Sequence, residues 1–307
     1  MIIVFNGASN IFMSDLCDEV ATEVESIGLS VIKIDSLRGL IGQLKTGKIG
    51  GVISPATSPL NVVISIFCRL FGAPFMVGIH DVVSHESKDG FKVFLYNKAL
   101  CFLAHEILVF SEFSRKEILL HFDRSAVVYL FGLRDDVDCS VEKDIDVLVF
   151  GRMLSYQGVE RLPELCDQLD DLRVVLASRS LVKEHFDNLS CEVIPEFISS
   201  GHLHNLVSRS KVVMLPYMSA TQSGHIPFAI ARGCVPVVTD VGALAEQVSP
   251  IGTTVLRGPF STEKFAALVR TSLMLASDVY LFRNWMEEKR RQNSGFGLFI
   301  RERFIRG

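Results

Sequence analysis

Residues 212–239 read VVMLPYMSATQSGHIPFAIARGCVPVVT, and this stretch decides the fold. It opens with a short apolar run and reaches a polar Thr-Gln-Ser-Gly turn at residues 221–224. The segment HIPFAIARG then favours a helix, and the β-branched run VPVVT favours a strand. The pattern therefore predicts strand, turn, helix and strand, the unit from which parallel α/β sheets are built.

The same alternation runs through the rest of the chain. In the first half we predict strands at IIVF, VIKI, GVIS, FMVGI, EILVF and AVVYL, and helices over Met13–Ile27, Leu60–Phe71 and Phe91–Leu103. In the second half we predict strands at DVLVFG, VVLA and CEVIP, and helices over Val159–Leu169 and Leu203–Ser208. The predicted fold class is α/β, with two Rossmann-like, doubly wound domains facing one another across a cleft.

A polar, charge-rich stretch at residues 132–146, GLRDDVDCSVEKDID, separates the two halves. We therefore predict domains at 1–138 and 139–278, followed by a helical tail at 279–307. The tail interleaves basic and aromatic residues between Trp285 and Arg306. A basic, aromatic segment can lie on an anionic membrane, and the alternative is a helix that packs back on the first domain.

Composition excludes several classes of protein. A chain of 307 residues with 49% hydrophobic and 21% charged residues is globular, and its net charge of −4 gives no reason to expect a nucleic-acid partner. Its seven cysteines are scattered and never spaced as C-x-x-C, which argues against a disulfide framework or a zinc site and predicts the reducing cytoplasm. Two Asp-x-Asp motifs, 136–138 and 144–146, are predicted to be solvated charge rather than a metal site.

Three segments together resemble a known family. A Ser-Gly turn at a helix start collects free backbone N–H groups, which suits phosphate. The three segments are residues 212–239, FGRMLSYQGVERL at 150–162 and FMVGIHDVVSHES at 75–87. Together they resemble family 4 glycosyltransferases. Residues 212–239 are most similar to a branch with the motif PY-x-x-ATQSG, associated with bacterial surface polysaccharide synthesis, and the resemblance implies the GT-B fold.

The resemblance also implies an activity. It implies retaining transfer of a sugar from a nucleotide-diphosphate donor to a glycan acceptor on a polyprenyl-diphosphate carrier, without a metal or other cofactor, at the inner face of the cell membrane. The catalytic residues that it implies are His80, Asp81 and Arg152. The donor-binding residues are Arg152, Gln157, Ala177, Arg179, Phe197, Ile198, Thr221, Gln222, Ser223, Gly224 and His225.

Each principal assignment has a physical reason. The planar fork of Arg152 can donate two parallel hydrogen bonds to phosphate oxygens. His80, at the end of a predicted strand, could bond a hydroxyl of the transferred sugar while Asp81 orients its ring or contacts the acceptor; the alternative is a core histidine bonded to a backbone carbonyl. His225 could donate to the diphosphate or lie exposed at a helix start. A further histidine, His85, is a weaker candidate.

The chain departs from the family at two places. Gln157 stands where the family has Lys, so the predicted phosphate site lacks one charge. The two Glu positions of the family fall on Ala220 or Thr221, and on Phe228 or Ala229. These departures keep open a non-catalytic protein that binds nucleotide sugars. The alternative enzyme is a nucleotide-sugar epimerase or phosphorylase on the same scaffold.

Overall fold

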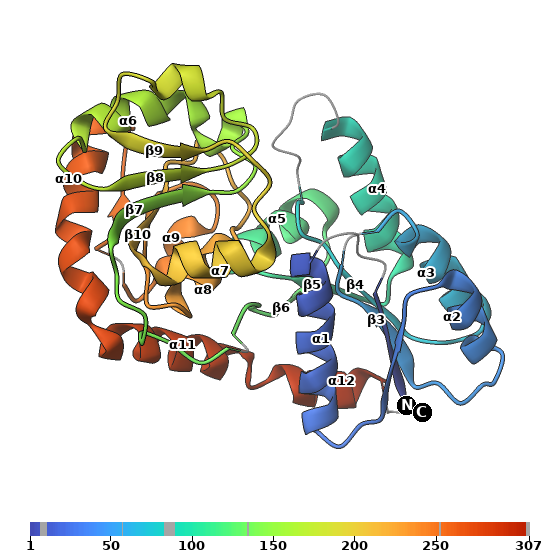
Figure 1. Ribbon diagram of the computed structural model, residues 1–307. Coiled ribbons are helices and arrows are strands. Elements are labelled where there is room, and N and C mark those ends of the chain that lie inside the picture. The colour runs from blue at the N-terminus through green and yellow to red at the C-terminus, as the bar shows by residue number, and fades with distance from the viewer. Residues whose placement is uncertain (7–10, 57, 83–89, 134, 252, 305–307) are drawn as a thin grey trace. The chain divides into compact units, whose positions relative to one another are not determined.

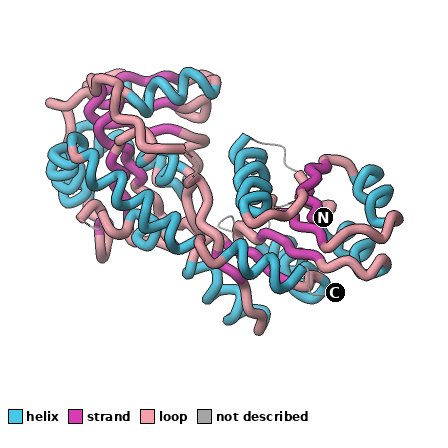
Figure 2. Tube along the Cα trace, turned by 90° about the horizontal axis from the view of Figure 1, so that it is seen from below, coloured by secondary structure: helices cyan, strands magenta, loops and turns pink. Residues whose placement is uncertain are grey.

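The computed structural model covers residues 1–307 and describes all of them except 7–10, 57, 83–89, 134, 252 and 305–307. The chain forms two compact units. Unit 1 comprises residues 1–134 and 289–307, and unit 2 comprises residues 135–288. Each contains one sheet flanked by helices (Figures 1 and 2).

Unit 1 is built on a six-stranded parallel sheet with the order β2-β1-β3-β4-β5-β6. Its strands are β1 (Ile2–Phe5), β2 (Val31–Ile34), β3 (Gly51–Ser54), β4 (Phe75–Gly78), β5 (Glu106–Val109) and β6 (Val127–Val128). Its helices are α1 (Ile11–Ser26), α2 (Leu37–Leu44), α3 (Asn61–Leu70), α4 (Gly90–Leu103), α5 (Glu112–Phe122) and α12 (Phe296–Phe304).

Alternate residues of these strands enter two separate cores, as the period of two in a strand requires. On one face Ile3, Val52 and Phe75 pack with side chains of α2, α3, α4 and α5. On the other face Ile2 and Ile53 pack with side chains of α1 and α12. The segment after unit 2 is thus part of the core of unit 1.

Unit 2 is built on a second six-stranded parallel sheet, with the order β12-β11-β10-β7-β8-β9. Its strands are β7 (Ile145–Phe150), β8 (Val174–Ala177), β9 (Cys191–Ile194), β10 (Ser210–Leu215), β11 (Val235–Thr239) and β12 (Val255–Leu256). Its helices are α6 (Leu162–Gln168), α7 (Ser200–Ser208), α8 (His225–Ile230), α9 (Leu244–Val248) and α10 (Thr262–Ser272), and α11 (Val279–Asn293) begins in unit 2 and ends in unit 1. Short 3₁₀ helices occur at Ser155–Gln157, Val159–Arg161, Lys183–Phe186 and Leu273–Ser277.

The unit boundaries differ from those that the sequence suggested. We placed the first boundary after residue 138, but residues 135–138 belong to unit 2. The Asp138 N–H donates to the Ala231 carbonyl, and Asp135 forms an ion pair with Arg232. Residues 279–288 also belong to unit 2, where the Trp285 indole donates to the Gln247 carbonyl.

The remainder of the tail is integrated into unit 1. Asn293 exchanges hydrogen bonds with the backbone of Leu130, and Phe296, Ile300 and Phe304 are buried. The aromatic side chains that suggested a membrane contact for the tail are therefore largely used in packing. Within the described part of the chain, no single helix could cross a membrane, although one bent pair, Thr262–Ala276 with Val279–Phe304, passes that test by length and composition alone.

Candidate functional site

The strand order of unit 2 identifies the place where a ligand would bind. From β7 the chain moves outward to β8 and β9, then returns to place β10 on the other side of β7. Loops after β7 and β10 therefore diverge at the carboxyl ends of two neighbouring strands. In open parallel sheets this switch point is the usual ligand site. Arg152 follows β7, and residues 221–225 follow β10.

The loop after β7 depends on two glycines with positive φ. Gly151 has φ +115°, and a Cβ there would lie 2.7 Å from Cε1 of His225. Gly158 has φ +79°, and a Cβ there would lie 2.2 Å from the Pro216 carbonyl oxygen. The loop after β7 thus packs directly against the segment after β10, and Arg152 between these glycines is exposed.

The turn after β10 is held from α9. The Gln247 amide clamps the backbone of Ser223, accepting from its N–H at 2.8 Å and donating to its carbonyl at 3.2 Å. The Ser223 hydroxyl in turn accepts from the His225 N–H. The Ser223 N–H, which we predicted to face phosphate, is thus bonded within the protein. Thr221 is buried and Gln222 is half-buried in the same turn.

A hydrogen-bonded series links the two loops. The side-chain oxygen of Gln157 accepts from the Leu154 N–H at 3.0 Å, which fixes the orientation of its amide. Its NH₂ donates to the Tyr217 hydroxyl at 3.0 Å, and that hydroxyl lies 3.0 Å from Nδ1 of His225. We call this series, Gln157–Tyr217–His225, the relay. All three side chains come from the switch point of unit 2.

The surroundings of His225 keep its imidazole neutral. The ring packs on Phe150 with centroids 4.3 Å apart and lies over Gly151. Burial, and secondarily the positive charge of Arg152, lowers the pKa of His225 to about 4. At neutral pH the ring therefore has one donor and one acceptor nitrogen. The same burial raises the pKa of Tyr217 to about 12, so its hydroxyl keeps its proton.

The structure brings together only part of the predicted donor site. Arg152, Gln157, residues 221–224 and His225 share the switch point, as described above. Ala177 is buried where β8 ends, and Arg179 is exposed in the turn that follows. Phe197 (78% exposed) and Ile198 follow β9. These four residues lie at the same edge of the sheet, at the ends of β8 and β9, which are one and two strands beyond β7.

In unit 1, His80 lies just beyond β4. Its ring stacks on Phe110 with centroids 4.1 Å apart, and Nε2 lies 3.2 Å from the Pro55 carbonyl oxygen. Gly78 permits this approach, because a Cβ there would lie 2.0 Å from the same oxygen. Since a carbonyl only accepts, Nε2 carries the proton and Nδ1 is the acceptor. Burial lowers the pKa of His80 to about 4, against the opposing effects of Asp81 and the Pro55 carbonyl.

This geometry matches the alternative of a core histidine bonded to a backbone carbonyl, and it leaves a sugar-facing role for Nδ1 as a prediction. Asp81 is exposed beside it. The Asp81 and Val82 carbonyls accept from Asn97 of α4 at 2.7 and 3.0 Å. His85 lies outside the described residues.

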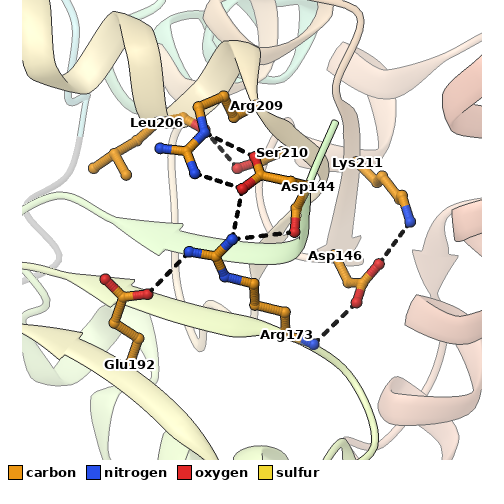
Figure 3. A network of polar contacts seen from close by, with 8 residues as sticks. All are labelled: Asp144, Asp146, Arg173, Glu192, Leu206, Arg209, Ser210 and Lys211. Carbon is orange, nitrogen blue, oxygen red and sulfur yellow. Dashed lines mark hydrogen bonds and ion pairs between the residues drawn. The ribbon is translucent and has the colours of Figure 1, made fainter. Parts of the chain in front are cut away.

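The charged cluster at the start of β7 corrects one prediction. Asp144 and Asp146 are not merely solvated, and they flank the first residue of β7 (Figure 3). Asp144 pairs with Arg209 and Arg173, and Asp146 pairs with Lys211. The cluster lies at the amino end of the sheet, opposite the switch point, so it stabilises unit 2 without belonging to the candidate site. Among the described residues, no group of three or more His, Cys, Asp or Glu side chains could hold a metal ion.

Sequence reasoning missed two residues of the site. Tyr217 belongs to the quoted PY motif, but nothing in the pattern indicated that its hydroxyl would join Gln157 to His225. Gln247 lies 24 residues after Ser223, and no local signal relates the two. Both act through contacts that only the folded sheet creates.

Comparison with known proteins shows what this fold resembles. No family model matches the chain, and no curated protein sequence matches it. Among solved structures, Anabaena Alr3699/HepE in complex with UDP and glucose matches with a TM-score of 0.69 and 15% identity, over 97% of this chain and 98% of that one. Sucrose-phosphate synthase from Thermosynechococcus elongatus matches with a TM-score of 0.68 and 15% identity, over 100% and 99%. A glycosyltransferase from Rickettsia africae matches with a TM-score of 0.64 and 14% identity, over 100% and 98%. The predicted fold class, α/β with two Rossmann-like domains, is confirmed.

Proposed function

We propose that this chain is a glycosyltransferase that takes its sugar from a nucleotide-diphosphate donor. The observation that carries the proposal is that Arg152 and His225 lie together at the switch point of unit 2. The fold is shared with a glycosyltransferase from Rickettsia africae and with Anabaena HepE, whose structure is a complex with UDP and glucose. Arg152 supplies a fixed positive charge, and His225 supplies a neutral hydrogen-bond donor beside it. Both kinds of group can donate hydrogen bonds to diphosphate oxygens.

The relay sets which nitrogen of His225 donates. Because the Gln157 amide donates to the Tyr217 oxygen, the Tyr217 proton is available for an acceptor, either Nδ1 of His225 or the Ser223 side chain, and we propose that it is donated to Nδ1. The ring proton then resides on Nε2, the nitrogen that a Cβ on Gly151 would approach to 3.2 Å. We propose that Nε2–H and the Arg152 guanidinium together bind the diphosphate oxygens on which negative charge develops as the sugar–phosphate bond breaks.

We further propose retention of configuration, with the leaving phosphate accepting the proton of the acceptor hydroxyl on the same face of the sugar. In this proposal Arg152 stabilises the leaving charge without a metal. His80 supports the transferred sugar through Nδ1. The acceptor is a glycan on a lipid carrier, and the chain acts in surface polysaccharide synthesis at the cytoplasmic side of the membrane. These finer assignments are supported by the motifs that resemble family 4 glycosyltransferases.

Calorimetric binding of UDP and GDP, with and without Mg²⁺, tests the donor site. We expect one nucleotide to bind without metal, and Arg152→Ala to weaken that binding at least about tenfold, because a charge-assisted hydrogen bond contributes roughly 1.5–3 kcal/mol. Arg283→Ala, an exposed arginine on α11, is the matched control and should bind like wild type. Equal nucleotide affinity of wild type and Arg152→Ala would show that the nucleotide does not bind at Arg152 and would contradict the proposed site.

Turnover separates the remaining alternatives. Slow hydrolysis of a nucleotide sugar, or transfer to a glycan, should depend on Arg152. Epimer or sugar-phosphate products would instead indicate an epimerase or a phosphorylase. Intact nucleotide binding without any product would favour a non-catalytic binding protein.

A further inference from the structure

The helical layer formed by α2, α3 and α4 has an unusual outer surface. These helices lie side by side on one face of the unit 1 sheet (Figure 1). Their inner side chains, among them Leu40, Ile64 and Leu100, are buried in the core. Several of their outward-facing side chains are also large and apolar, although these side chains do not pack in the core of unit 1.

The exposed apolar side chains form a stripe on each of two helices. On α3, Val63, Ile66 and Leu70 follow at intervals of three and four residues, and Leu70 is 74% exposed. On α4, Phe91, Leu95 and Phe102 share one face, and Phe91 and Phe102 are 74% and 75% exposed. The two helices are in contact, and Arg69 of α3 donates to the Phe102 carbonyl. We call this surface the α3–α4 face.

The helices α2, α3 and α4 carry positive charge only, and the acidic residues Asp81, Glu86 and Asp89 lie in the sequence between α3 and α4. Residues 36–80 and 90–105 contain no Asp or Glu, although the whole chain carries a net charge of −4. Their basic residues are all exposed, and they are Arg38, Lys45, Lys48, Arg69, Lys92 and Lys98. Lys98 lies on the same side of α4 as Leu95 and Phe102, three residues from one and four from the other.

We propose that the α3–α4 face docks on an anionic lipid bilayer. Exposed aromatic and aliphatic side chains beside lysines are what an interfacial helix presents to lipid, because the apolar groups enter the acyl boundary while the cations meet the headgroups. A second copy of this chain fits poorly. A symmetric contact would place one cationic face against the same face, and like charges would repel.

This proposal does not depend on the sugar-transfer function, and it differs from a contact through the tail. In the part of the tail that belongs to unit 1, Phe296, Ile300 and Phe304 are buried, and Leu298 is the one exposed large apolar residue among those described. The α3–α4 face, in contrast, offers several such side chains together. Docking here is peripheral.

Vesicle flotation of the full chain tests the proposal. We expect flotation with vesicles of about three parts phosphatidylcholine to one part phosphatidylglycerol, and little with phosphatidylcholine alone. Each cation should contribute about fivefold to partitioning. Lys92→Glu/Lys98→Glu should therefore lower it more than about 20-fold, and raised salt should weaken wild-type binding. Leu70→Ser/Phe102→Ser should abolish flotation without changing thermal unfolding, because both side chains are exposed.

Matched controls lie in unit 2. Met274→Ser/Tyr280→Ser removes side chains that are 80% and 84% exposed, and Lys183→Glu reverses an exposed charge; all should float like wild type. Three results would overturn the proposal. The first is wild-type protein that does not float. The second is loss of binding in Arg301→Glu/Arg303→Glu but not in Lys92→Glu/Lys98→Glu. The third is a wild-type dimer in light scattering that Leu70→Ser/Phe102→Ser dissociates.

Discussion

Gln157 gives the loop after β7 hydrogen bonds that a lysine at this position could not make. A lysine at this position would bring a charge, but it has no acceptor atom for the Leu154 N–H. Gln157 accepts that N–H and donates to Tyr217 at the same time. Its side chain is buried, and its amide orients the groups that it bonds within the protein. The charge at the candidate site is left to Arg152.

Removing the Tyr217 hydroxyl should disconnect this relay. In Tyr217→Phe, Nδ1 of His225 loses its hydrogen-bond partner, so the ring should lose its single tautomer and nucleotide affinity should fall about two- to tenfold. Nitrogen NMR of ¹⁵N-histidine-labelled protein, with His225→Ala to identify the signals, measures the tautomer directly. Tyr280→Phe on the surface is the control. A His225 signal that is the same in wild type and Tyr217→Phe would contradict the relay.

The sequence indicated some of these residues and not others. Arg152 and His225 were predictable because each follows a recognisable strand in a recognisable motif. The partners Gln157 and Tyr217 are 60 residues apart, and their contact arises only because β7 and β10 become neighbours. The same limit applies to Gln247 and Ser223. Local pattern therefore predicts the ends of strands better than the side chains that meet there.

At the level of elements, the loop after β7 depends on Gly151. In Gly151→Ala the new Cβ would lie 2.7 Å from the His225 ring, and φ of +115° is unfavourable for any L side chain. We expect loss of nucleotide binding and lower thermal stability. Gly258→Ala is the matched control, since φ is +83° but no atom lies within 4 Å of the new Cβ. Gly258→Ala should lower thermal stability but leave nucleotide binding unchanged. Equal nucleotide binding in Gly151→Ala and Gly258→Ala would show that binding does not need His225.

The ion-pair cluster at the opposite end of the sheet should make unit 2 sensitive to acid. The hydrogen bond from Arg209 holds the pKa of Asp144 well below its ordinary value. Its contribution to stability is therefore fully present above the unfolded pKa of about 3.9, and it is lost as pH falls through the lower folded pKa. Asp144→Asn should lower the thermal midpoint at pH 7, and the difference from wild type should shrink in strong acid. A constant difference at all pH values would contradict this account.

Strands were predicted more accurately than helices. All strands named from the sequence exist, with ends shifted by a few residues, because continuous apolar runs mark buried parallel strands. We did not predict α2, α5, α9 or α10, although Ser36, Ser111 and Ser261 cap the amino ends of α2, α5 and α10. The helix predicted over Val159–Leu169 divides into a 3₁₀ turn and α6, which has a proline in its first turn.

At the level of the whole molecule, the stability of unit 1 depends on α12, which follows unit 2 in the sequence. The Phe304 ring packs so closely on β3 that a Cβ on Gly51 would lie 2.0 Å from it. Phe304→Ala should therefore destabilise unit 1 by about 3–5 kcal/mol. Leu298→Ala, on the same helix but 62% exposed, should have little effect.

The single tryptophan allows the two units to be followed separately. Trp285 is buried in unit 2, so its fluorescence reports that unit, whereas circular dichroism reports both. In Phe304→Ala we expect part of the dichroism transition to move to lower urea concentration while the fluorescence transition stays in place. Equal shifts of both signals would show that the units unfold together.

The return of the chain to unit 1 also bears on how the protein is made. The ribosome synthesises β1 to β6 first, then all of unit 2, and only afterwards α12. Until α12 emerges, the sheet face that includes Ile2 and Ile53 lacks part of its cover, whereas unit 2 already has all its strands. Unit 2 should therefore reach its native state first, which reverses the usual order of folding from the N-terminus during synthesis. In that interval the uncovered face of unit 1 is a natural target for chaperones that bind apolar nascent chain.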